Sequence, residues 1–283
     1  FTTFDPTPLA SASIGQAYAA TLEDGTEVVV KVRRPGVVEQ VERDLEILEI
    51  LAATASHRWE LADQYDVVAL TQEFADTLRA ELDYVREGRN AERFAENFTG
   101  DPAVHIPRVF WETTTSQVIT LERIRGIKIS DLAALDAAGL DRHSLAERAA
   151  NILLRMVFED GFFHADPHPG NFFIEPDGRI GLIDFGMVGV VDERTLQQLV
   201  RLLLAITSQD ADRLVDAFLD LGVARKRVNR VLLRQDLQPL ITRYYDHPLG
   251  EIALGPLIED TLAVTRRHHL QLPSTLALLL KTA

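Results

Sequence analysis

The sequence predicts an α+β protein in which a small lobe of antiparallel strands and helices precedes a larger helical lobe. Three observations predict this class. Strand patterns separated by turns fill the first part of the chain, helical patterns fill the part after residue 144, and a short strand–turn–strand pattern lies within the second part. The 283 residues suffice for one domain with two lobes. We place the boundary near Ile124–Gly126, with an amino-terminal lobe over 1–124 and a carboxy-terminal lobe over 125–283.

The amino-terminal lobe is expected to open with a hairpin followed by helices. Residues 12–22 and 26–32 have the composition of paired strands around a Glu-Asp-Gly turn, and Arg34-Pro35-Gly36 ends the second strand. Apolar residues at helical spacing predict a helix over 37–55. The charged stretch over 66–98 predicts either one long helix or two helices broken near Gly88.

The remaining elements follow from similar patterns. A strand pair around a threonine-rich turn is expected over 106–124, and a hairpin with a Pro-Asp-Gly turn is expected over 172–183. Asp192 has the position of a helix N-cap. Helices are expected over 144–163, 193–210 and 212–223.

Composition excludes some classes of function. A formal net charge of −14 argues against a general nucleic-acid binder, and the absence of cysteine excludes disulfides, thiolate metal sites and a cysteine nucleophile. No signal peptide and no apolar run of the roughly 18–20 residues that cross a bilayer are visible. The chain begins at Phe1 without methionine, so we expect a piece of a longer protein.

The most informative motifs are HADPHPGN at 164–171 and IDFG at 183–186. They place Asp166, Asn171 and Asp184 in the order and spacing of a kinase catalytic loop and metal-binding loop. Phosphoryl transfer needs a carboxylate that orients the nucleophile, together with a carboxylate and an amide oxygen that hold Mg²⁺ on the phosphates. The predicted hairpin at 172–183 carries Asn171 at one end and Asp184 at the other, so both face one metal site.

Lys31 is a candidate phosphate ligand. It is one of only four lysines and lies on the apolar strand VVVKV, where a compact ammonium can reach nucleotide phosphates. The helical stretch at 66–98 offers Glu81, Asp83 and Glu87 as acidic partners. On a continuous helix Asp83 and Glu87 share a face, whereas Glu81 points elsewhere.

The segment PLASASIGQ at 8–16 stands where a kinase has its glycine-rich phosphate cover, and we expect a loop there. Ala10, Ser11, Ala12 and Ser13 make this cover stiffer than glycines would and supply two hydroxyl groups.

A short segment follows the metal-binding motif and bears on the substrate. Only residues 187–191 separate Gly186 from Asp192, which leaves no room for the long activation segment that positions a peptide substrate. Phosphorylation of peptides is therefore not expected.

Together these motifs resemble the UbiB/AarF family of atypical kinases. ASASIGQ is similar to the alanine-rich loop of that family, KVRRPG to its nucleotide-lysine strand, ELD at 81–83 to its ExD motif, and HADPHPGN with DFG to its catalytic core. The likeness runs from PLASASIGQ to at least Asp184. It implies a protein-kinase-like fold of two lobes that binds ATP and Mg²⁺.

The resemblance also implies residue roles. Lys31 pairs with Glu87, Glu81 and Asp83 face a KxGQ helix, and the backbone of Glu122 to Ile124 meets adenine. The implied nucleotide contacts are Ala10, Ser11, Ala12, Ser13, Lys31, Glu87, Glu122 and Ile124; the implied metal ligands are Asn171 and Asp184; and the implied catalytic residue is Asp166.

Two departures from the family pattern are visible. No KxGQ occurs in these 283 residues, so we expect that autoinhibition by that helix cannot operate in this piece. Ser11 stands where the family usually has a third alanine.

The expected function is that of an Mg²⁺-dependent kinase or ATPase that supports isoprenoid-quinone biosynthesis or lipid homeostasis. The resemblance implies a lipid or quinone precursor as partner, a membrane biosynthetic complex, and a cytoplasmic protein that is peripheral to or anchored on a membrane.

Two alternatives stay open. One is a nucleotide-sensing scaffold without turnover. The other is a small-molecule kinase of the aminoglycoside or choline type, although ASASIGQ, KVRRPG and ELDYVREGRN are not features of that group. The sequence does not identify the phosphoryl acceptor.

Overall fold

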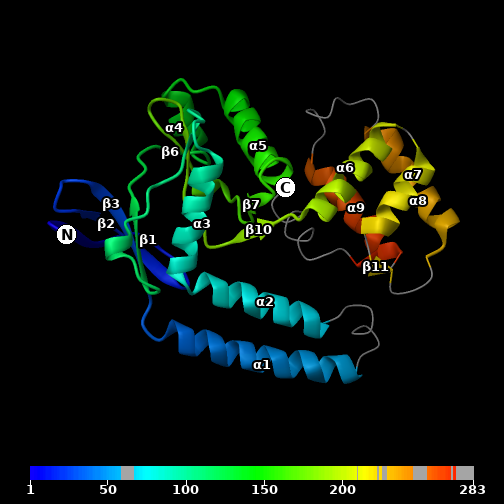
Figure 1. Ribbon diagram of the computed structural model, residues 1–283, viewed down its shortest axis with the longest axis horizontal. Helices are drawn as coiled ribbons and strands as arrows, with labels where there is room; N and C mark the ends of the chain where they lie inside the picture. Colours follow the sequence, from blue (N-terminus) through cyan, green and yellow to red (C-terminus); the bar gives the residue numbers. More distant parts are fainter. Residues whose placement is uncertain are drawn as a thin grey trace. The chain divides into compact units, whose positions relative to one another are not determined.

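The chain folds into two compact units. The computed structural model describes residues 1–58, 67–208, 210–221, 223–224, 228–244, 254–268 and 270–271 (Figure 1). The first unit comprises Phe1–Ala149 and Pro167–Val188, and the second comprises Ala150–Asp166 and Gly189–Ala283. This division differs from the lobe boundary that we place near residues 124–126, which stays a prediction.

The first unit contains an antiparallel sheet with strand order β1-β2-β3-β5. Its strands are β1 (Thr3–Ser11), β2 (Gly15–Thr21), β3 (Glu27–Arg33) and β5 (Val118–Glu122). Alternate apolar side chains of β2 and β3, among them Ala20, Val28 and Val30, form a buried cluster on one face. This alternation is the period of two that a half-buried strand requires.

The expected loop at 8–16 is mostly strand, which corrects the sequence-based prediction. Ala10 and Ser11 belong to β1 and pair with Ala17 and Gln16 of β2. Only residues 12–14 form the turn between the two strands. We expected a loop because the segment stands where a kinase has its glycine-rich cover. The strand tolerates Pro8 because β1 is an edge strand, where proline removes no needed hydrogen bond.

Three helices complete this part of the first unit. They are α1 (Val37–Arg58), α2 (Val67–Glu81) and α3 (Tyr84–Asn97). Helices α1 and α2 share a buried cluster that includes Val41, Leu45 and Ala75.

The helix break lies at Leu82–Asp83 rather than near Gly88, which corrects a second prediction. Asp83 is the N-cap of α3, and its carboxylate accepts a hydrogen bond from the Val85 amide. Gly88 lies inside α3, where a Cβ would come within 2.8 Å of the Trp111 ring. Its small size serves the packing of that ring and does not end the helix.

A second sheet of the first unit has strand order β4-β9-β8-β6. Its strands are β4 (Val104–His105), β6 (Ile127–Lys128), β8 (Phe172–Ile174) and β9 (Ile180–Leu182). The predicted hairpin at 172–183 is confirmed as β8 and β9. Gly178 supplies the positive φ of its turn, and the Gly178 amide donates to the Glu175 carbonyl.

The strand pair expected over 106–124 is only partly present. Strand β5 forms its second half, whereas its first half contributes one isolated bridge, between Val109 and Leu121, and the 3₁₀-helix η2 (Trp111–Thr113). The Thr114 hydroxyl donates to the Phe110 carbonyl, which tightens this segment into turns.

Two helices follow β6 along the chain, α4 (Leu132–Ala137) and α5 (Arg142–Phe158), and the division into units falls within α5, after Ala149. The helix predicted over 144–163 therefore ends early. The chain turns at Gly161, which has a positive φ, and then enters β7 (Phe162–His164).

The second unit is mainly helical. Its further elements are β10 (Val188–Val190), α6 (Glu193–Thr207), α7 (Ala211–Leu221), β11 (Val223–Ala224), α8 (Arg230–Tyr244), α9 (Leu254–Arg267) and β12 (Leu270–Gln271). Asp192 caps α6 as predicted and accepts from the Thr195 amide at 2.7 Å. Leu214, Phe218 and Leu237 lie at the centre of the core. No helix in the described part of the chain is both long and apolar enough to cross a bilayer.

The packing of Tyr84 against β2 generates a testable prediction. A Cβ on Gly15 would lie 2.2 Å from the Tyr84 hydroxyl oxygen and 3.0 Å from the Val32 carbonyl oxygen. Gly15→Ala should therefore lower the free energy of unfolding by about 1–3 kcal/mol, the usual cost of overpacking. Tyr84→Phe removes the hydroxyl group, so the double variant should regain part of this loss in urea unfolding. Equal losses with and without the hydroxyl group would contradict this packing.

Candidate active site

Lys31 lies at the centre of a cluster of charges in the first unit. It occupies the middle of β3, between Ala17 of β2 and Ile119 of β5. Its Nζ lies 2.5 Å from Glu87 Oε1 and 3.4 Å from Asp184 Oδ2. The exposed fractions of the Lys31 and Glu87 side chains are 16% and 5%. The expected Lys31–Glu87 pair is thus present, and a third predicted site residue lies beside it.

The pKa of Lys31 reflects this arrangement. Burial alone would lower it, but the carboxylates of Asp184 and Glu87 more than offset burial and hold the pKa above the ordinary value of lysine. Burial raises the pKa of the Glu87 carboxyl, and the Lys31 ammonium opposes that rise. The ammonium is therefore the group that makes a buried carboxylate tolerable at this position.

Helix α3 fixes the position of Glu87. The Asp83 cap starts the helix, and Glu87 lies in its first turn, where the helix dipole favours an acidic side chain. Glu87 Oε1 also accepts from the Phe185 amide at 3.4 Å, and Asn90 Nδ2 donates to the Phe185 carbonyl at 2.8 Å. Helix α3, which carries Glu87, is therefore hydrogen-bonded to the backbone of Phe185, directly after Asp184.

Asp184 has a strained backbone. Among the described residues it is the only non-glycine residue with positive φ, at 68°. Such a conformation costs on the order of 1–3 kcal/mol and persists where the surroundings impose it, often at functional sites. Its side chain is half exposed, which leaves the carboxylate able to accept a ligand.

Asn171 lies next to Asp184 because the β8–β9 hairpin brings its two ends together. The Ile183 amide donates to the Asn171 carbonyl at 3.0 Å. The two residues offer a carboxylate and an amide oxygen, which suit Mg²⁺ when phosphate and water supply the remaining ligands. Within the described residues, no group of three His, Asp or Glu side chains could hold a metal ion by itself.

Asp166 belongs to the second compact unit, whereas the residues described above belong to the first. Its backbone is held by a neighbour that sequence reasoning did not single out. The Asp166 amide donates to His164 Nδ1 at 3.1 Å, and His164 is buried at the end of β7. The signal for this role is the HxD pattern itself, in which the histidine lies two residues before the aspartate.

Arg34 holds the turn between β1 and β2, a contact that the sequence did not reveal. Its guanidinium donates to the Ala12 carbonyl at 3.0 Å and to the Ser11 hydroxyl at 2.7 Å. Its amide donates to the Ile14 carbonyl. KVRRPG is typical of a solvent-exposed arginine cluster. Arg34 nevertheless binds the end of β1 and the following turn, which together contain the predicted phosphate contacts Ala10 to Ser13.

The predicted ExD residues do not lie on one helix. Glu81 ends α2, whereas Asp83 caps α3. Glu87 lies one turn after Asp83 on α3, and its amide donates to the Asp83 carbonyl at 3.3 Å. The Glu81 side chain lies beside Gly186, since a Cβ on that glycine would be 3.9 Å from Glu81 Cγ.

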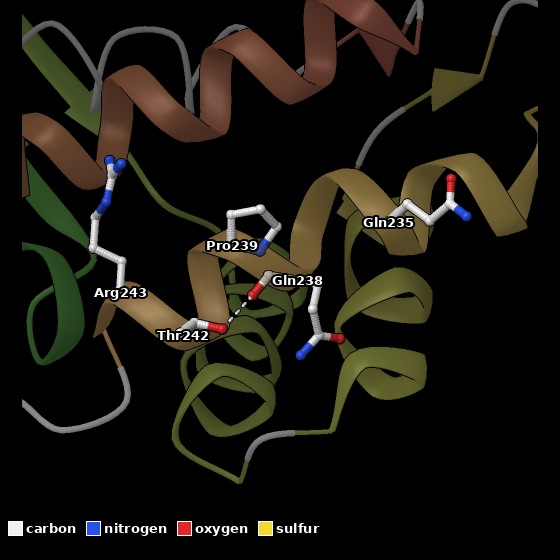
Figure 2. Close-up of a pocket in the computed structure, with 5 residues that line it drawn as sticks. All are labelled: Gln235, Gln238, Pro239, Thr242 and Arg243. Carbon is white, nitrogen blue, oxygen red and sulfur yellow. Dashed lines mark hydrogen bonds between the residues drawn. The ribbon is translucent and has the colours of Figure 1, made fainter.

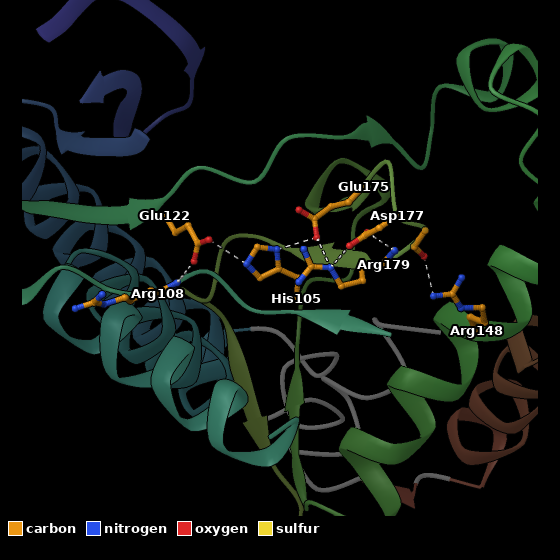
Figure 3. A network of polar contacts seen from close by, with 8 residues as sticks. His105, Arg108, Glu122, Arg148, Glu175, Asp177 and Arg179 are labelled. Carbon is orange, nitrogen blue, oxygen red and sulfur yellow. Dashed lines mark hydrogen bonds and ion pairs between the residues drawn. The ribbon is translucent and has the colours of Figure 1, made fainter. Parts of the chain in front are cut away.

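The predicted adenine hinge lies at the end of β5. Glu122 Oε2 accepts from the Arg108 amide at 3.2 Å, and Glu122 Oε1 lies 3.4 Å from His105 Nε2 (Figure 3). The Ile124 side chain packs over Gly181 of β9, whose missing Cβ leaves it room. The hinge is thus anchored to the sheet that carries the predicted metal ligands.

A pocket in the second unit contains none of the predicted site residues. It is lined by Gln235, Gln238, Pro239, Thr242 and Arg243 of α8 (Figure 2). The Thr242 hydroxyl donates to the Gln238 carbonyl one turn earlier in the same helix. Its lining lacks a carboxylate or histidine that could perform acid–base chemistry.

Two family models match the chain. A family model described as the ABC1 atypical kinase-like domain matches residues 1–218. A second, described as the UbiB helical domain, matches residues 237–283. The kinase-like α+β fold that the sequence predicts is therefore confirmed.

Individual relatives match the chain over its whole length. A protein of Xylella fastidiosa named "Probable protein kinase UbiB" is 37% identical over 288 residues, which cover 100% of this chain and 52% of that protein. An uncharacterized protein of Synechocystis sp. is 36% identical over 282 residues, which cover 99% of this chain and 48% of that protein. The chain thus spans about half the length of these curated relatives.

A solved structure also resembles the chain. It is the complex of Rv3197 with erythromycin from Mycobacterium tuberculosis, which has a TM-score of 0.61 and 26% sequence identity. The match covers 95% of this chain and 74% of that chain.

The buried pair generates a second prediction. Lys31→Met leaves the Glu87 and Asp184 carboxylates without their ammonium, and losing one partner of a buried pair costs about 3–5 kcal/mol. We expect a loss of this order at pH 7.5. The loss should shrink as the pH falls, because a carboxyl whose folded-state pKa is raised stabilises the fold only when protonated.

The matched control is Lys128→Met, because Lys128 is exposed on β6. It should change the free energy of unfolding by less than about 0.5 kcal/mol. Lys31→Met combined with Glu87→Gln should recover most of the loss, as a double-mutant cycle by urea unfolding can measure. Additive losses in the two single variants would contradict the coupling.

Proposed function

The chain belongs to the ABC1 atypical kinase-like family, as its resemblance to UbiB proteins predicted, and we propose that it binds ATP with Mg²⁺ and transfers or hydrolyses the terminal phosphoryl group. The observation that carries this proposal is the cluster of Lys31, Glu87 and Asp184, which places an ammonium, its orienting carboxylate and a strained carboxylate within hydrogen-bonding range. Since the chain spans about half of its curated relatives, the activity of the whole protein is part of the proposal.

The role of Lys31 follows from its contacts. The 2.5 Å contact with Glu87 fixes the direction of the side chain, whereas the 3.4 Å contact with Asp184 is longer and weaker. A nucleotide phosphate can therefore replace Asp184 as the second partner of the ammonium while Glu87 keeps it in place.

Asp184 and Asn171 would hold Mg²⁺, which neutralises charge on the phosphates when bound. Asp184, half exposed and held in its strained conformation, is already turned toward Lys31 and thus toward the place of the phosphates. Asp166 would orient the nucleophile and accept its proton. The backbone from Glu122 to Ile124 would meet adenine.

The acceptor is proposed from the segment that follows Asp184. Strand β10 begins at Val188, and α6 begins directly after Asp192, so a long ordered activation segment is absent between these residues. We therefore propose water or a small lipid-like molecule rather than a peptide. Following the family resemblance, we propose a role in isoprenoid-quinone or lipid metabolism, with the full-length protein cytoplasmic and peripheral to or anchored on a membrane.

The experiment that tests this function is Mg²⁺-dependent ATP hydrolysis, measured with and without liposomes that contain a phenolic quinone precursor. Asp166→Asn should lower turnover by about 10²–10⁴-fold, the range for loss of a general base, with ATP affinity retained. Asp184→Asn should also weaken Mg²⁺-dependent ATP binding, by at least about tenfold, or 1.4 kcal/mol.

The control is Asp136→Asn, an exposed aspartate that pairs with Arg142 on the surface. It should leave binding and turnover unchanged. ATP binding without turnover in wild type and all variants would favour a nucleotide-binding scaffold. Full turnover in Asp166→Asn would contradict the proposed role of that carboxylate.

The Arg34 contacts give a separate prediction on the same site. Arg34→Ala removes two side-chain hydrogen bonds from the β1–β2 turn, each worth on the order of 0.5–1.5 kcal/mol. Both are exposed, so we expect a fall in ATP affinity of about fivefold, roughly 1 kcal/mol. Arg43→Ala is the matched control, because within the described residues Arg43 donates only to the Glu39 carbonyl of its own helix. Equal ATP affinities in the two variants, by isothermal titration calorimetry, would contradict the role of Arg34.

A further inference from the structure

One histidine joins the predicted hinge to the hairpin that carries the metal ligands. His105 lies in β4, and β4 pairs in parallel with β9. Its Nδ1 lies 2.8 Å from Glu175 Oε2, and its Nε2 lies 3.4 Å from Glu122 Oε1. Glu175 stands at the turn between β8 and β9, and Glu122 ends β5. A single ring therefore spans two predicted parts of the nucleotide site.

The protonation state of this ring decides whether it can make both contacts. A neutral imidazole has one N–H and one lone pair, so it can donate to only one carboxylate while its second nitrogen faces the other with a lone pair. An imidazolium donates from both nitrogens. The observed arrangement, a ring between two carboxylates, is favourable only for the charged form.

We propose that His105, as an imidazolium, is a positioning residue that holds the predicted adenine hinge against the β8–β9 hairpin. Nucleotide binding therefore weakens when the ring loses its proton. This inference rests on the proposed function and names a means of its regulation. The residue acts through Glu122 and Glu175 and touches no predicted ligand of the metal.

The surrounding charges support the charged ring. Arg179 Nε lies 3.2 Å from Glu175 Oε2 and 2.7 Å from Asp177 Oδ2 (Figure 3). The Arg108 amide donates to Glu122 Oε2. The carboxylates of Glu122, Glu175 and Asp177 carry three negative charges and Arg179 carries one positive charge, so the group has two negative charges in excess. A neutral His105 would leave that excess unbalanced.

The pKa of His105 is raised above 6.5. The hydrogen bond to Glu122 raises it most, burial acts against the rise, and Glu175 adds to it. The bridge therefore contributes stability that is complete below pH 6.5 and is lost as the pH rises through the raised pKa. Glu122 is more exposed than Glu175, and its contact with the ring is the longer one, so we expect the hinge contact to be released first.

The hairpin transmits this change because it is short. Strands β8 and β9 have three residues each, and Asn171 and Asp184 lie just outside their ends. The Glu175 amide donates to the Arg179 carbonyl across the turn, and Arg148 donates to the Gly178 carbonyl from α5. The turn is thus fixed from α5, and His105 links it to the hinge.

The test is the dependence of ATP affinity on pH, measured by titration calorimetry from pH 6 to 9 at saturating Mg²⁺. The variants are His105→Gln, which cannot titrate, and His143→Gln, a matched control whose exposed histidine pairs with Glu147 on α5. Wild type and His143→Gln should lose affinity by threefold or more as the pH rises. His105→Gln should bind more weakly than wild type at pH 6 and lose less affinity. Parallel pH profiles in wild type and His105→Gln would overturn the proposal.

A second readout needs no nucleotide. The imidazole of His105 can be titrated by NMR in protein with ¹³C-labelled histidine, with His105→Gln as the assignment control. A pKa above 6.5 is expected, and a pKa at or below 6.5 would overturn the proposal. If wild type binds no ATP at any pH, a raised pKa in the same sample shows that the proposed function failed and that the bridge itself is present.

Discussion

The burial of the Lys31 ammonium between two carboxylates is the interaction on which the rest of the first unit depends. A charge with 16% of its side chain exposed needs compensation, and here Glu87 and Asp184 provide it from two different elements. The ammonium therefore fixes β3, α3 and the loop after β9 relative to one another. Asn90 and Glu87 add hydrogen bonds from α3 to the backbone of Phe185.

Local signals made part of this structure predictable. The Pro-Asp-Gly turn predicted the β8–β9 hairpin, and Asp192 predicted the start of α6, because a few adjacent residues determine turns and caps. The Lys31–Glu87 pair came from the family resemblance, since spacing along the chain left three acidic partners open. The α+β class followed from the order of strands and helices, whereas the kinase-like fold came from the motifs and the family resemblance.

Other features depend on contacts between distant residues and were not predictable. Gly88 has the sequence signature of a helix breaker, but the Trp111 ring packs over it and α3 continues. Arg34 and His105 carry charges that resemble ordinary surface groups, and only the fold brings Ser11 to the first and two carboxylates to the second. Each contact joins the predicted nucleotide site to a neighbouring element.

We propose that the charge cluster around Lys31 binds the phosphates of ATP together with Mg²⁺. The most direct measurement is a crystal structure of the protein with Mg²⁺ and a non-hydrolysable ATP analogue. We expect a phosphate oxygen within hydrogen-bonding distance of Lys31 Nζ, Mg²⁺ on Asn171 and Asp184, and an intact Lys31–Glu87 pair. A nucleotide bound without contact to Lys31, or Mg²⁺ bound to other residues, would contradict it.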